Sequence, residues 1–146
     1  MNNVENITNS VSLGQKIAFG LGMLANQLFP ALLSIFIVVL IQDLGFNPLL
    51  YAVIAFVPRF IDALTDPLMG FISDNTKSKW GKRRQYVFVG GILTGIAFIL
   101  SWQLYPENGE TYNFWYFLIF NLIFYLGITI FGVPFVAMGY EMSENF

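Results

Sequence analysis

Three ionisable side chains, Arg59, Asp62 and Asp66, lie inside an apolar stretch that runs from residue 49 to residue 73. Their spacing of three and four residues places them on one face of a helix, where the two carboxylates can converge on one point. In a bilayer each ionised aspartate costs about 2.5–3.5 kcal/mol. A bound cation, a proton held by one carboxylate, or a switchable ion pair with Arg59 would offset that cost, and the Thr65 hydroxyl could add a ligand oxygen.

These options all describe a cation-coupled device, but two other readings stay open. A static Arg59–Asp62 pair could simply lock helix packing, although such a lock needs no second carboxylate. Paired aspartates could also perform acid–base chemistry inside the membrane, although that leaves the basic loop described below unexplained. The chain contains no Cys and no His, which excludes disulfides, thiolate metal sites and triads that use His as base. We therefore expect no enzyme activity and no cofactor.

Composition places these residues in an integral membrane protein, because 56% of the 146 residues are hydrophobic, 11% are charged and the mean hydropathy is +0.64. About 20 helical residues cross a bilayer. We predict four spans, at about 17–41, 49–73, 86–105 and 114–139, all helical because no water satisfies the backbone there. The polar N-terminus does not resemble a cleavable signal peptide, so the first span would be a signal anchor.

Charge distribution predicts the orientation. Basic residues outside the spans occur at Lys16 and between residues 77 and 84, whereas the other two loops carry only acids. The positive-inside rule then places the N-terminus, the second loop and the C-terminus in the cytoplasm. We expect a multi-pass protein of the plasma or inner membrane that contacts lipid and binds no nucleic acid.

The second loop places an acid beside a basic cluster. Asp74 ends the second span near the negative end of the helix dipole, and basic partners follow it. Gly70 and Gly81 would allow close approach and a tight turn. A simple positive-inside anchor would need these charges but not the spacing of Gly70 and Asp74. The basic residues are Lys77, Lys79, Lys82, Arg83 and Arg84.

Two further patterns concern packing. Gly90, Gly91 and Gly95 form a small-residue stripe that predicts close helix contact. The aromatic-rich stretch 112–125 reads mainly as lipid-facing bulk, in which Asn121 would bond a neighbouring helix or line a cavity.

The stretch "DPLMGFISDNTKSKWGKRRQY" resembles the second-span and loop signature of the glycoside–pentoside–hexuronide:cation symporters, the melibiose permease-like branch of the major facilitator superfamily. "RFIDALTDP" resembles the cation-site helix of that family, and "GVPFVAMGYEMSENF" its fourth-span ending. The resemblance covers nearly the whole chain. It implies an all-α membrane fold in which residues 1–146 form the first four of twelve helices, with the C-terminal part of the same chain missing.

The resemblance also implies roles for individual residues. It assigns cation binding to Asp62, Asp66, Thr65 and Thr129, and makes Arg59 a charge partner of the carboxylates. The coupling ion would be Na⁺, Li⁺ or H⁺. A cytoplasmic gating loop would comprise Gly70, Asp74, Gly81, Lys82 and Arg83.

The residues at the family's sugar-binding positions differ from those of melibiose permease. Gln27, Gly132 and Val136 stand where melibiose permease has two acids and a tryptophan that bind sugar. Asn26 and Gln27 could hydrogen-bond the hydroxyls of a solute, or could simply link helices.

We therefore expect a cation-coupled symporter of a small polar solute such as a sugar or glycoside, represented by part of its N-terminal half. The alternative is a complete four-span structural or regulatory subunit. The reading frame beyond Phe146 separates the two.

Overall fold

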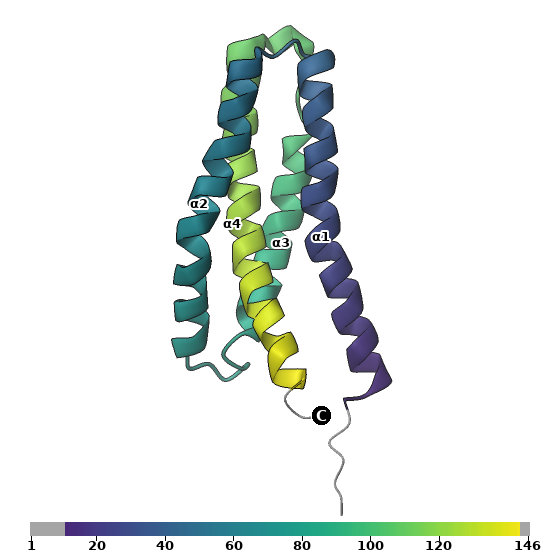
Figure 1. Cartoon of the computed structure of the whole chain (residues 1–146), viewed down its shortest axis with the longest axis vertical. Coiled ribbons are helices and arrows are strands. Elements are labelled where there is room, and N and C mark those ends of the chain that lie inside the picture. The colour runs from purple at the N-terminus through teal and green to yellow at the C-terminus, as the bar shows by residue number, and fades with distance from the viewer. Residues whose placement is uncertain (1–10, 144–146) are drawn as a thin grey trace, which may run out of the picture.

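The structure is a computed structural model that describes residues 11–143. Its four long helices are α1 (Leu13–Gln42), α2 (Pro48–Asn75), α3 (Arg84–Ser101) and α4 (Glu110–Ser143), and one 3₁₀ turn, η1 (Pro106–Asn108), precedes α4 (Figure 1). All four helices are long and apolar enough to cross a membrane, which confirms the predicted all-α, four-span architecture. The first ten residues, with most of the polar N-terminal stretch, and the last three, through Phe146, lie outside the described range.

The helix boundaries follow from local sequence. A capping box opens α1, since the Gln15 amide donates to Ser12 Oγ at 3.3 Å and the Ser12 amide donates to Gln15 Oε1 at 3.0 Å. The third helix ends at Ser101, so its predicted extension to residue 105 is wrong. Pro106 accounts for Tyr105, because a residue before proline is driven out of the helical region and Tyr105 is extended (φ −128°, ψ 133°).

Helix α4 is the central element, packing against each of the other three helices. The core that it forms with them contains Phe117, Phe124, Leu33 and Ile54, each at most 1% exposed. The lipid-facing interpretation of the aromatic stretch is therefore wrong for many of its members. A helix covered on several sides must be apolar nearly all round, and such a sequence does not reveal which side faces lipid.

Only one glycine of the predicted stripe makes a backbone contact that requires glycine. A Cβ atom at Gly90 would lie 2.4 Å from the backbone nitrogen of Phe131 on α4, whereas a Cβ at Gly95 would meet nothing within 4 Å. A matching contact occurs at Gly127 of α4, where a Cβ would lie 2.9 Å from the backbone nitrogen of Thr94. Reciprocal glycines thus bring α3 and α4 together.

We predict that Gly90→Ala destabilises the protein by about 1–3 kcal/mol, because overpacking against a backbone atom cannot be relieved by a side-chain rotation. Thermal unfolding in detergent, followed by the loss of the monodisperse peak in size-exclusion chromatography, measures this. Gly95→Ala is the matched control and should unfold at or above the wild-type temperature, since alanine favours helix. Equal behaviour of the two variants would contradict the packing described.

Candidate functional site

Helices α2 and α4 bring the two predicted aspartates to one hydroxyl group. Thr129 Oγ1 lies 2.9 Å from Asp66 Oδ1 and 3.4 Å from Asp62 Oδ1. Thr129 is only 4% exposed. Its single proton can be donated to one carboxylate at a time, so the other carboxylate receives no hydrogen bond from it.

The two helices run in the same direction and keep a constant register along their contact. Asn121 Nδ2 donates to the carbonyl oxygen of Ile54 at 3.4 Å, and Thr129 meets Asp62 eight residues further along both helices. Proline at position 58 has no N–H to bond the carbonyl of Ile54, four residues earlier. Asn121 thus satisfies the acceptor that Pro58 leaves free, which supports the interhelical reading of this residue. Helix α2 continues unbroken through both of its prolines.

A cavity of about 400 Å³ opens beside the carboxylates, and α1 and α4 supply its other walls. The polar residues that line it are Asn26, Asp62, Asp66, Thr129 and Tyr140. A second cavity of about 390 Å³ adjoins it and is lined by Gln27, Ser34, Arg59 and Tyr125, among others. Asn26, Asp62 and Ile128 line both cavities. The predicted cation and solute residues therefore border a shared space.

Thr65 is placed differently from expectation, whereas Arg59 lies beside the site and lines the second cavity together with Asp62. Thr65 donates its hydroxyl to the carbonyl of Ile61 at 3.1 Å within its own helix, and it lines neither cavity. The Arg59 guanidinium lies over the Tyr125 ring, 5.6 Å from its centroid. Among the ion pairs of residues 11–143, none includes Arg59. A static lock between Arg59 and Asp62 is thus not present in this conformation.

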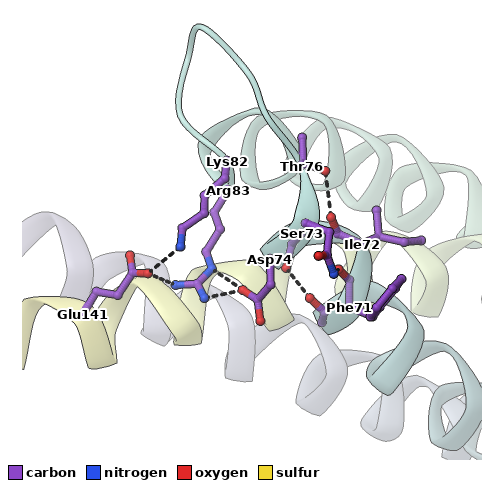
Figure 2. Close-up of polar contacts among 10 residues, drawn as sticks. Phe71, Ile72, Ser73, Asp74, Thr76, Lys82, Arg83 and Glu141 are labelled. Carbon is purple, nitrogen blue, oxygen red and sulfur yellow. Dashed lines mark hydrogen bonds and ion pairs between the residues drawn. The ribbon is translucent and has the colours of Figure 1, made fainter.

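Three of the predicted gating residues, Asp74, Lys82 and Arg83, lie close together with Glu141, where α2 and α4 end and α3 begins (Figure 2). Arg83, whose side chain is 11% exposed, forms an ion pair with Asp74, and its Nη1 lies 2.6 Å from Glu141 Oε1. Lys82 Nζ lies 3.4 Å from the same Glu141 oxygen. Gly81 takes a φ of +93°, which favours glycine.

Glu141 was missed as a partner of this cluster, although an acid ending the fourth span on the basic side of the bundle was a usable signal. At Gly70, in contrast, a Cβ atom would meet only Val133 Cγ1 at an ordinary 3.8 Å. No close approach of a neighbouring helix therefore requires a glycine at position 70.

We predict that Arg83→Gln destabilises the protein by about 1.5–3 kcal/mol and lowers its unfolding temperature. The change removes a largely buried guanidinium, which leaves Asp74 without its charged donor and Glu141 with Lys82 alone. Arg84→Gln is the control, since Arg84 is exposed and takes part in no ion pair among the described residues. Thermal unfolding in detergent at low ionic strength checks the difference. If both variants lose the same small amount, the cluster does not hold the three helices together.

Comparison with known proteins adds the family. Residues 18–146 match the family described as MFS/sugar transport protein. The chain belongs to this family. That confirms the resemblance to the melibiose permease-like cation symporters, and it confirms the expectation of a transport protein rather than an enzyme. The intramembrane-enzyme interpretation is accordingly dropped, and the chain is that of a multi-pass membrane protein.

Three relatives illustrate the kinds of transporter that the chain is similar to. The chain is 28% identical to the inner membrane symporter YicJ of Escherichia coli over 92% of its own length and 29% of the relative's. It is 30% identical to the sodium-dependent lysophosphatidylcholine symporter 1 of Xenopus tropicalis, over 94% of its length and 26% of the relative's. It is 29% identical to the lactose permease of Lactobacillus delbrueckii subsp. bulgaricus, over 77% and 19%. The chain thus spans less than a third of each of these relatives. No solved structure matches it significantly.

Proposed function

We propose that this chain carries the cation site of a cation-coupled symporter, which moves Na⁺, Li⁺ or H⁺ together with a small polar solute. One observation supports this most directly: the Thr129 hydroxyl lies within hydrogen-bonding distance of both Asp62 and Asp66, from the neighbouring helix. Two carboxylates gathered around one hydroxyl, inside a stretch apolar enough to span a bilayer, are stabilised when a positive ion binds between them.

The donor set suits a hard cation. Carboxylate and hydroxyl oxygens are hard ligands. Among residues 11–143, no three His, Cys, Asp or Glu side chains come together as a metal-binding group. The ligands would therefore be Asp62, Asp66 and Thr129, while Thr65 is left to its own helix. A proton shared by the two carboxylates would supply the same single positive charge as a bound Na⁺ or Li⁺.

The solute would occupy the adjoining cavity. Asn26 and Gln27 offer amide groups there, and Ser34 adds a hydroxyl, although that hydroxyl already donates to the carbonyl of Pro30 at 2.9 Å. The relatives include a lactose permease and a lysophosphatidylcholine symporter, so the polar solute is proposed only as a class.

Cation binding and solute binding would be coupled through the residues that line both cavities. Because Asn26 and Asp62 line both cavities, a cation that reorients the Asp62 carboxylate changes the surface that the solute contacts. Any such gain in solute affinity must be matched by an equal gain in cation affinity.

The Asp74–Arg83–Glu141 cluster would act as the gate on the cytoplasmic side. The beginning of α1 and the end of α4 lie at the same end of the bundle as the α2–α3 loop (Figure 1), as an even number of spans requires. The basic residues of that loop support a cytoplasmic location for this end. A cysteine introduced at Lys79 in a cysteine-free background tests this side, since an impermeant maleimide should label it only after permeabilisation.

We predict that Asp62→Asn and Asp66→Asn, each made in the complete reading frame, abolish cation binding, while Thr129→Val weakens it about tenfold (about 1.4 kcal/mol). Thr129→Ser keeps the hydroxyl and should bind nearly as the wild type does. Titration of the purified protein with NaCl, LiCl or acid, by calorimetry and by a pH electrode, measures binding.

Asp43→Asn serves as the control, since Asp43 is an exposed acid in the α1–α2 loop. It should leave cation affinity unchanged. Undiminished binding in both Asp62→Asn and Asp66→Asn would refute the proposed site. A stop codon directly after Phe146, with no cation binding by the wild type, would favour the four-span subunit instead.

A further inference from the structure

The cavity proposed for the solute has a positively charged side chain in its wall. Arg59 lines this space of about 390 Å³ together with Gln27, Ser34 and Tyr125. Helix α2 places Arg59 well inside a segment that is long and apolar enough to cross a membrane. An arginine at this depth is costly unless a partner of opposite charge or polarity stabilises it.

The described chain offers Arg59 an aromatic ring but no anion at contact distance. Within residues 11–143, the guanidinium forms no ion pair and no hydrogen bond. Its Cζ lies 5.6 Å from the centroid of the Tyr125 ring, whose face attracts a cation. That attraction pairs none of the five N–H donors with an acceptor oxygen. Tyr125 therefore holds the guanidinium beside the cavity and leaves its donors available.

The acid that lines the cavity with Arg59 belongs to the proposed cation site as well. Asp62 borders both cavities, whereas Asp66 borders only the cavity of the cation site. A cation bound between these two carboxylates would balance the negative charge of Asp62. The charge of Arg59 would then be opposed by no other ionised residue among those that line the solute cavity, so this cavity would favour an anion.

We propose that Arg59 binds an acidic group of the solute, a carboxylate, sulfonate or phosphate, and so selects small organic anions. The planar guanidinium can donate two parallel N–H bonds to such a group, and the amide of Gln27 adds neutral donors. The cavity lies within the ~300–1,000 Å³ range of small-molecule sites. This proposal rests on the proposed function, because it names the class of solute for the same cavity.

Coupling then has an electrostatic origin. A cation on Asp62 and Asp66 removes the negative charge that would repel an anionic solute, and the solute's acidic group in turn attracts the cation. Each ligand raises the affinity of the other by the same factor.

A small sulfonate reagent tests the charge of the cavity without a known solute. This chain contains no cysteine. In the complete reading frame, with any other cysteine replaced, Ser34→Cys or Ala31→Cys places a thiol in the cavity wall. The purified protein is treated with the anionic sulfonatoethyl and the cationic trimethylammonioethyl methanethiosulfonates. The ratio of the two modification rates reports the local potential, and the neutral methyl reagent corrects for access.

In NaCl, Arg59→Gln should lower this anion-to-cation ratio about tenfold, as expected for the loss of one unit charge in a site of low effective dielectric constant. Arg59→Lys keeps the charge and should preserve the ratio. Arg84→Gln removes an equal charge from a residue that does not line the cavity, so it should leave the ratio unchanged. Equal ratios with Arg59 and with Gln at this position would overturn the proposal and would indicate that an acid from the rest of the protein neutralises Arg59.

The same rates measured in KCl, NaCl and LiCl and at lowered pH separate this proposal from the cation site. A ratio that rises when the coupling cation is added, and falls in Arg59→Gln, supports both. A ratio that falls in Arg59→Gln but responds to none of these cations leaves the role of Arg59 intact and counts against the cation site alone.

Discussion

The main physical constraint on this protein is the free-energy cost of keeping two carboxylates four residues apart in an apolar helix. Burial and mutual repulsion both oppose the ionised pair. Within residues 11–143, the hydrogen-bond donor that reaches both acids is Thr129 of α4, which follows Asp66 by 63 residues and Asp62 by 67. That hydroxyl cannot neutralise two charges, so the arrangement is one in which a further positive charge is stabilising.

Placing Thr129 there requires α4 to lie at the centre of the bundle. Contacts on two sides hold it. Toward α3, Gly90 and Gly127 allow the backbones to approach closely. Toward α2, Asn121 bonds the carbonyl that Pro58 leaves free, eight residues before Thr129 meets Asp62. A proline that weakens one helix internally thus creates the acceptor that fixes the register between two helices.

The sequence predicted the parts of this arrangement that depend on local pattern. The length of the apolar segments predicts the four spans, and the spacing of Asp62 and Asp66 predicts that both lie on one face of a helix. The position of Asp74 beside a basic loop predicts an ion pair. Thr129 could be named only through family resemblance, since nothing in its neighbourhood distinguishes it from other hydroxyls in apolar helices. Such a hydroxyl chooses between its own backbone, as Thr65 does, and another helix, as Thr129 does.

Other features could not be read from pattern because they depend on which helix faces which. The aromatic residues of α4 are apolar on every side of the helix, so their burial was decided by the position of α4 and not by periodicity. Likewise, Gly90 and Gly95 look alike in sequence, yet only Gly90 meets a backbone. Glu141 joined the charge cluster because α4 ends beside the α2–α3 loop.

Infrared difference spectroscopy tests the central claim most directly, because carboxylate stretching bands report whether a cation or a proton binds the aspartates themselves. When potassium is replaced by sodium or lithium, or when the pH is lowered, the complete protein should show carboxylate difference bands that disappear once both acids are changed to asparagine. A spectrum without carboxylate bands, or one whose bands survive that double change, would contradict the account.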